Sequence, residues 1–124
     1  RAPPGIELPR HRTSGSTTIY TVQGRWKYRE HEWVAGPGSL VIEPASACNT
    51  PQILADGTDD VIMLLLIAGD VQLLDSDDRV VRIESWRTAV SRYLDFCRAN
   101  DIEPRNITST GGCTGVCRET RGAA

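Results

Sequence analysis

The 124-residue sequence predicts an all-β domain, an antiparallel sandwich or barrel, followed by one α-helix. Three observations predict this fold class. Short runs rich in β-branched and aromatic residues recur along most of the chain, clusters of Gly, Pro and Asp separate them, and a single late segment has helical periodicity. At this length the chain is expected to form one domain around a single core.

The first expected strands lie between residues 17 and 46. Residues 17–29 predict two strands joined around Gln23-Gly24, because β-branched and aromatic residues flank this turn sequence on both sides. Residues 32–46 predict another strand pair, broken at a Gly-Pro-Gly sequence. Pro44 ends the last of these strands, since proline cannot donate a hydrogen bond to a ladder.

The remaining strands are expected between residues 52 and 83. A short strand at 52–54 precedes the apolar run 61–68, whose length and composition suit a buried strand. The following segment, 70–83, predicts a hairpin that turns around Ser76-Asp77-Asp78. Barrels of this kind keep a small cavity lined by alternate residues of each strand, and any chemistry is expected there.

One helix is expected over about residues 85–99, with Ser85 as its N-cap. Its apolar stripe follows the spacing i, i+3, i+4, i+7, i+8, i+11 and consists of Trp86, Ala89, Val90, Tyr93, Leu94 and Cys97. The stripe is interpreted as a contact with the outside of a sheet, with a dimer face as the alternative.

From about residue 107 the chain is polar and has no periodicity, so 107–124 are expected to be a disordered tail. Cys113 and Cys117 lie in this tail. Zinc needs four ligands and no second pair lies nearby, so the two thiols are interpreted as incidental.

Composition limits the partners and the compartment. Charged residues make up 24% of the chain and the formal net charge is −2, so neither nucleic acid nor a membrane surface is expected as a partner. The longest apolar run, 61–69, is too short to span a bilayer. Four scattered cysteines do not make a disulfide framework and no secretory signal is visible, so a reduced cytoplasmic protein is expected.

Two separated motifs carry a family resemblance. The first reads Gly5, five residues, His11, one residue, Thr13, then a strand up to Gly24, and the second reads Gly38, five residues, Pro44, one residue, Ser46, two residues, Asn49. In this spacing the sequence resembles the cupin superfamily, and most of all the cupins related to 2,4'-dihydroxyacetophenone dioxygenase, an iron enzyme that cleaves a carbon–carbon bond with dioxygen. The resemblance covers about residues 5–100, including the helix, and implies a cupin barrel (a double-stranded β-helix, or jelly roll), so the cupin domain is expected over 1–106. It also implies that some N-terminal strand sequence is absent.

The metal-ligand positions of the family carry other residue types here. The resemblance aligns those positions with His11, Thr13, Thr17 or Thr18, and Asn49. Glu30 matches a carboxylate that this subfamily uses as a ligand. Non-haem Fe(II) is held by imidazoles and a carboxylate, and hydroxyl or amide groups are weak ligands for it. We therefore expect a degenerate metal site, with no metal and no other cofactor.

A pocket with these groups still suits proton transfer. His11 is expected to act as general acid or base, with Glu30 orienting it or sharing its proton. Tyr20 shares a strand face with Thr18, is expected to point inward, and is the third catalytic candidate. His31, next to Glu30, is expected to point out of the barrel. The substrate-binding candidates are Thr13, Thr18, Asn49, Arg25 and Trp26.

The expected function is metal-independent acid–base chemistry on a carbonyl-bearing small molecule: cyclisation, isomerisation or dehydration, in secondary metabolism. A non-catalytic cupin that binds a small molecule is one alternative, and an Fe(II)-dependent dioxygenase that cleaves a carbon–carbon bond is another. A third is an interaction partner that uses the helix stripe. A homodimer is expected as the oligomeric state.

Overall fold

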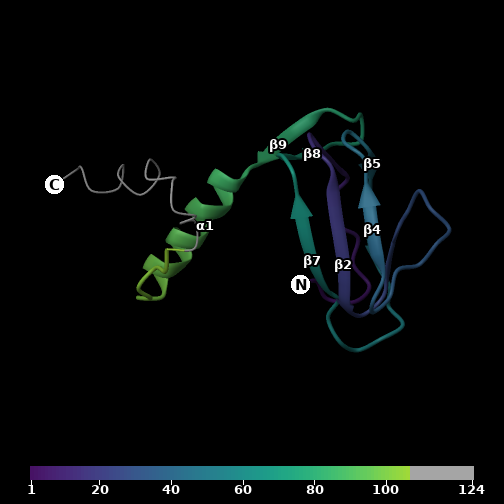
Figure 1. Cartoon of the computed structure of the whole chain (residues 1–124), viewed down its shortest axis with the longest axis horizontal. Helices are drawn as coiled ribbons and strands as arrows, with labels where there is room; N and C mark the ends of the chain where they lie inside the picture. The colour runs from purple at the N-terminus through teal and green to yellow at the C-terminus, as the bar shows by residue number, and fades with distance from the viewer. Residues whose placement is uncertain (107–124) are drawn as a thin grey trace. The chain divides into compact units, whose positions relative to one another are not determined.

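The computed structural model describes residues 1–106 (Figure 1). The predicted tail with Cys113 and Cys117 lies outside these residues. The chain divides into two compact units, one from Arg1 to Ala89 and one that begins at Val90. The first unit contains the strands and the candidate site. No helix within residues 1–106 is long and apolar enough to cross a membrane.

Nine strands, all paired antiparallel, make up three sheets in the described part of the chain. The sheets have the orders β5-β1-β8-β9, β4-β2-β7 and β3-β6, and Figure 1 shows β4, β2 and β7 side by side. With one helix after the last strand, this confirms the predicted all-β class. The elements are β1 (His11–Thr13), β2 (Thr17–Gln23), β3 (Trp26–Tyr28), β4 (Leu40–Glu43), β5 (Cys48–Asn49), β6 (Pro51–Ile53), β7 (Ile62–Ile67), β8 (Val71–Leu74), β9 (Val80–Glu84) and α1 (Trp86–Ala99).

The two strands predicted around Gln23-Gly24 are present as β2 and β3, but they belong to different sheets. β2 pairs with β4 and β7, whereas β3 pairs with β6. Gly24 has φ +80°, and a Cβ at this position would lie 2.6 Å from Cγ2 of Val61. A side chain here would therefore face both backbone strain and a clash.

The strand pair predicted over 32–46 is half wrong, because only β4 forms. Ala35 exchanges two backbone hydrogen bonds with Trp26, of 2.8 and 3.0 Å, and the bridge stops there. Before it, the Trp33 ring packs edge-on against Trp26 and Tyr28 at centroid distances of 5.7 and 5.5 Å. Aromatic packing therefore takes the place of a ladder in this segment.

The apolar run 61–68 forms β7, but the expectation that it is buried holds for only part of it. Val61 is buried, whereas all four residues from Leu64 to Ile67 are exposed, Leu64 and Leu66 the most. Met63, Leu65 and Ile67 alternate with these two leucines and line a cavity that is partly open to solvent. Strand alternation therefore splits this run between the two faces of its sheet.

The hairpin and the helix are confirmed as predicted. β8 and β9 pair around the expected turn, where Asp75 Oδ1 accepts hydrogen bonds of 2.9 Å from the N–H groups of Asp77 and Arg79. At the start of α1 the Ser85 hydroxyl accepts a hydrogen bond of 3.3 Å from Thr88 N–H. This bond satisfies one of the N–H groups that a helix start leaves unpaired.

The core of the first unit lies between the sheets and holds the largest buried side chains. Trp26 and Tyr28 of β3 pack edge-to-face with ring centroids 5.1 Å apart. Trp26 Nε1 donates a hydrogen bond of 2.8 Å to the buried Thr21 hydroxyl, so its polar atom is satisfied. The other members of the core are Ala2, Ile19, Ala35, Ile53 and Val61.

Candidate functional site

An apolar cavity of about 230 Å³ lies inside the barrel. Its walls come from β1, β2, β3, β6, β7 and β8, which matches the prediction of a cavity lined by alternate strand residues. The polar side chains among its lining are His11, Thr13, Thr17 and Tyr28, and the rest are Leu8, Pro9, Ile19, Trp26, Pro51, Met63, Leu65, Ile67, Val71 and Leu73. Such a lining suits a small, mainly apolar ligand oriented by a few polar groups.

His11 is the basic group of this cavity. It begins β1, and its Nδ1 lies 3.2 Å from the Pro9 carbonyl oxygen. A carbonyl can only accept, so Nδ1 carries the proton and Nε2 of the neutral ring is left with a free lone pair. Asn49 of β5 stands directly opposite His11 in the strand register. Side chains in such a pair point to the same face.

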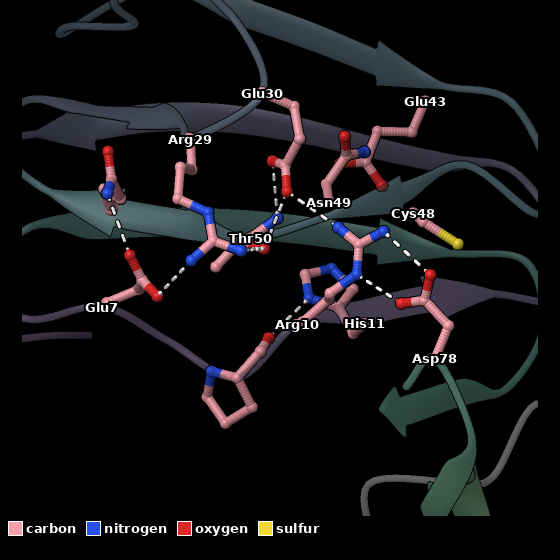
Figure 2. Close-up of polar contacts among 12 residues, drawn as sticks. Glu7, Arg10, His11, Arg29, Glu30, Glu43, Cys48, Asn49, Thr50 and Asp78 are labelled. Atoms are coloured by element: carbon pink, nitrogen blue, oxygen red, sulfur yellow. Dashed lines mark hydrogen bonds and ion pairs between the residues drawn. The ribbon is translucent and has the colours of Figure 1, made fainter. Parts of the chain in front are cut away.

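Glu43 is a buried carboxyl group that interacts electrostatically with His11, and it was not among the residues predicted from the sequence. It ends β4, pairs with Thr17 and is only 3% exposed. Asn49 Nδ2 donates a hydrogen bond of 3.3 Å to its Oε1 (Figure 2). Burial raises the pKa of Glu43, and the Asn49 hydrogen bond, together with the positive charge that His11 carries when it is protonated, offsets this only in part. Glu43 therefore holds its proton to a higher pH than a free glutamate.

The alternation of side chains along β4 could have identified Glu43 as an inward-facing residue. Val41 packs against the core, and Glu43, two residues later, must point to the same side. Tyr28 was also missed, although it follows Trp26 at the same spacing and lines the same cavity.

Thr13 and Thr17 form the polar end of the cavity. Thr17 Oγ1 donates a hydrogen bond of 3.2 Å to Thr13 Oγ1, which in turn donates one of 2.7 Å to the Gly15 carbonyl. Both residues are buried. Their protons are therefore committed to this chain of hydrogen bonds, and the Thr17 oxygen remains as an acceptor toward a ligand.

Glu30 lies in a different region from the one predicted for it. Its carboxylate accepts hydrogen bonds from Thr50 N–H at 2.9 Å and the Thr50 hydroxyl at 2.8 Å, and Arg10 Nη1 lies 2.8 Å away (Figure 2). Burial raises the pKa of Glu30, but the Thr50 hydrogen bonds and the charge of Arg10 outweigh it and lower the pKa overall. Arg10 also pairs with Asp78 at 2.6 Å. The Glu30 oxygens are thus engaged by these partners and not by His11.

Tyr20 and Thr18 lie on the outer face of β2, so the prediction that they point inward is wrong. Thr17, Ile19 and Thr21 are buried, and the side chains between them project the other way. Tyr20 is exposed. The sequence pattern identified the two residues as sharing a face but assigned the wrong face to the cavity.

Of the remaining candidate residues, one lines the cavity and the others lie outside its lining. Trp26 forms part of the cavity wall, while Arg25 pairs with Asp56 outside the cavity lining. His31 is exposed, as predicted, and its ring stacks on Trp33 at a centroid distance of 5.5 Å.

The donor set of the site does not fit an iron centre of the oxygenase type. Such a centre uses two histidines and a carboxylate on one face of the metal. Residues 1–106 contain no group of three or more His, Cys, Asp or Glu side chains that could hold a metal ion. The cavity lining has one imidazole and no carboxyl group, while Glu43 and Asn49 line a second pocket that shares Tyr28 with it.

Comparison with known proteins identifies relatives among solved structures. No protein-family model and no curated protein matches the sequence. An RmlC-like cupin protein from Ralstonia eutropha JMP134 is 44% identical with a TM-score of 0.83, over 87% of this chain and 69% of that one. A cupin-like protein of unknown function from the same organism is 20% identical (TM-score 0.77), over 83% of this chain and 64% of that one.

An acetylacetone dioxygenase from Acinetobacter johnsonii is 17% identical with a TM-score of 0.67, over 75% of this chain and 63% of that one. At this identity the likeness to the dioxygenase extends to the fold alone. The chain thus spans about two thirds of the length of these structures.

Proposed function

The chain belongs to the cupin superfamily, and on that premise we propose that it catalyses metal-independent proton transfer on a carbonyl-bearing small molecule. The cupin barrel with a C-terminal helix, expected from the two motifs, is confirmed. The activity is our proposal. One observation carries it: His11 lines an apolar cavity, and its Nδ1 lies 3.2 Å from the Pro9 carbonyl oxygen, which assigns the ring proton to Nδ1 and leaves Nε2 as the base.

In the proposed reaction His11 is the general base. Its Nε2 removes a proton from the carbon next to the substrate carbonyl, and the electron pair moves onto the carbonyl oxygen. The Pro9 carbonyl supports the imidazolium that forms, because it continues to accept from Nδ1. An imidazole base is suited to neutral pH.

Glu43 is the proposed acid partner. Burial raises the pKa of Glu43, so it holds its proton to a higher pH than a free glutamate. In the proposed reaction it donates this proton to the developing enolate oxygen from the second pocket, which shares Tyr28 with the cavity. Asn49 orients the group through its bond to Oε1. Return of a proton to a different carbon completes an isomerisation, loss of a β-hydroxyl as water gives a dehydration, and attack on a second carbonyl gives a cyclisation.

The apolar lining supports both the substrate class and the mechanism. Aliphatic and aromatic side chains make up most of the cavity wall, and this low-polarity surface strengthens the interaction between an enolate oxygen and a nearby donor. With no lysine or arginine among the lining residues, a strongly anionic substrate is not favoured.

The donor set also favours proton transfer over oxygen chemistry. One imidazole and one carboxyl group with a raised pKa are a suitable acid–base pair, but they lack the second imidazole that an iron oxygenase uses. Binding of a small ketone without turnover is the second candidate. The largely apolar lining supports it, because that lining would hold such a ligand without any proton transfer.

The test is α-proton exchange of simple ketones in D₂O, with cyclohexanone as the first probe and EDTA present throughout. Loss of the α-proton signal is followed by NMR with and without protein. The His11→Asn variant is the informative one, because an asparagine amide can still donate to the Pro9 carbonyl but has no atom at the place of Nε2. His31→Asn is the matched control, since His31 lies on the surface.

We expect exchange with the wild type and with His31→Asn, and a loss of about 100-fold or more with His11→Asn. Exchange that does not depend on His11 would overturn the proposed base. Ketone binding without exchange in a broader panel would replace catalysis by the binding function. Activity that appears only after Fe(II) is added would favour the dioxygenase alternative.

A further inference from the structure

Tyr28 ends β3 and lines both the apolar cavity and the second pocket, the one that contains Glu43. The residue is only 2% exposed. Three aromatic rings pack against its own, those of Trp26, Trp33 and His31, at centroid distances of 5.1, 5.5 and 6.1 Å. Packing of this kind fixes the direction of the Tyr28 ring, and with it the position of the hydroxyl group.

The Tyr28 hydroxyl makes no hydrogen bond to another protein group within residues 1–106, although a buried tyrosine normally satisfies this group. Every fully buried side-chain nitrogen or oxygen in the same part of the chain does have a partner. The hydroxyl is therefore not sealed inside the packed core, and the open spaces that Tyr28 borders are the cavity and the second pocket. A hydroxyl without a partner at such a wall is available to a ligand.

The other polar side chains in the described cavity lining have already donated their protons. His11 gives its Nδ1 proton to a backbone carbonyl, and Thr17 and Thr13 donate in series to another. Trp26 donates its indole proton to a threonine hydroxyl. A ketone oxygen accepts hydrogen bonds but cannot donate them, so it needs a donor. Tyr28 is the lining side chain whose proton is left for this oxygen.

We propose that the Tyr28 hydroxyl holds the carbonyl oxygen of the ligand in the cavity by donating a hydrogen bond to it. The ligand class, a carbonyl compound, rests on the proposed function, but the bond itself needs no turnover. An oxygen held at Tyr28 lies at the border with the pocket of Glu43, the proposed proton donor. The bond strengthens as negative charge develops on that oxygen during enolate formation.

The test compares two probes of nearly the same shape: cyclohexanone, and methylenecyclohexane, in which a CH₂ group replaces the carbonyl oxygen. Their dissociation constants are measured by NMR titration of the isotope-labelled full chain. The indole N–H signal of Trp26 reports binding, because Trp26 lines the cavity. Tyr28→Phe removes only the hydroxyl. Tyr20→Phe is the matched control, because it makes the same change at an exposed residue of β2.

We expect Tyr28→Phe to weaken cyclohexanone binding by about tenfold and methylenecyclohexane binding by no more than about twofold, because only the ketone loses a hydrogen bond. Tyr20→Phe should change neither dissociation constant. Infrared spectroscopy of the isotope-labelled ketone should also show a lower C=O stretching frequency when it is bound to the wild type than when it is bound to Tyr28→Phe.

Equal weakening of both probes would assign Tyr28 to packing alone and overturn the proposal. Unchanged ketone binding would overturn it too, as would a wild type that binds no ketone. If Tyr28→Phe does not fold, as judged by circular dichroism, the wild-type C=O frequency decides. A value below that of the ketone in hexane supports the bond, and an equal value rules it out.

This result is separable from the fate of the proposed function. If α-proton exchange depends on His11 while Tyr28→Phe leaves ketone binding intact, only the role of Tyr28 falls. If the ketone-selective weakening is found without any exchange, the catalytic proposal falls and Tyr28 remains the anchor of a binding site.

Discussion

Glu30 and Glu43 belong to two polar regions of the same barrel, and the two regions have opposite effects on a carboxyl group. At Glu30 a cation and two donors from Thr50 surround the carboxylate, and the pKa is lowered. At Glu43 a single amide donor stands in a buried environment, and the pKa is raised. A carboxylate whose charge is this well satisfied stabilises structure, whereas one that favours its neutral form can donate a proton.

The largest expected effect separates these roles in the exchange assay. Glu43→Gln should lower α-proton exchange by about 100-fold, because glutamine has nearly the same shape but no acidic proton to give. Glu30→Gln should lower it by no more than about threefold, since Glu30 binds Arg10 and Thr50 away from the cavity lining. The assay is the NMR exchange measurement described above. An equal loss in both variants would break the contrast between the two carboxyl groups.

The second effect concerns stability, and here the change at Glu30 should have a larger effect than the change at Glu43. Glu30→Ala removes the partner of Arg10 and of both Thr50 donors, and we expect it to lower the free energy of unfolding by about 2 kcal/mol. Glu43→Gln should change this free energy by no more than about 0.5 kcal/mol, because burial disfavours the charged form of Glu43 and glutamine keeps the shape of its neutral form. Urea unfolding followed by tryptophan fluorescence measures both. A larger loss for Glu43→Gln would show that Glu43, not Glu30, is the structural carboxylate.

The third effect is a smaller change in how stability depends on pH. The pKa of Glu43 lies above its ordinary value of 4.5, so its contribution is fully present below that pH and is lost as the pH rises through the raised pKa. Wild-type protein should therefore lose stability relative to Glu43→Gln as the pH increases from 4.5 toward neutrality.

Glu30 should show the reverse dependence. Its pKa lies below 4.5, so its contribution is present above that pH and is lost as the pH falls through the lowered pKa. The stability advantage of wild type over Glu30→Gln should then shrink in acid. Urea titrations at a series of pH values check both slopes, and two slopes of the same sign would contradict the assigned environments.

The smallest effect tests whether the chemistry is confined to the inner face of β2. Tyr20→Phe should leave α-proton exchange within about twofold of wild type, because the Tyr20 hydroxyl lies on the outer face. Thr17→Val, on the inner face, is the companion variant and should have the larger effect. A strong loss with Tyr20→Phe would restore Tyr20 as a catalytic candidate.

Local features of the fold were predictable where they depend on neighbours in the chain. The β8–β9 hairpin and the cap of α1 are examples, because Asp75 and Ser85 bond groups two to four residues away. The strand pair predicted at 32–46 failed because Trp33 packs on rings from β3. That contact depends on where another strand lies, which local propensity does not contain.

Part of the site was also predictable. The motif spacing identified His11, Thr13 and Asn49, and the structure brings His11 and Asn49 opposite one another. Alternation grouped Thr18 with Tyr20 correctly but does not say which of the two strand faces is buried. The choice of Glu30 over Glu43 failed because both are single carboxylates in strand-rich sequence, and only their partners distinguish them.

The sequence by itself determined the all-β class, the cupin motif spacing, the position of the helix and the presence of one histidine at the motif. Only the tertiary structure decided that Thr17 and not Tyr20 faces the cavity, that Glu43 is buried near His11, and that the second half of β7 is exposed. The physical reason is that period-two alternation sets which side chains share a face, whereas pairing between distant strands sets which face is covered.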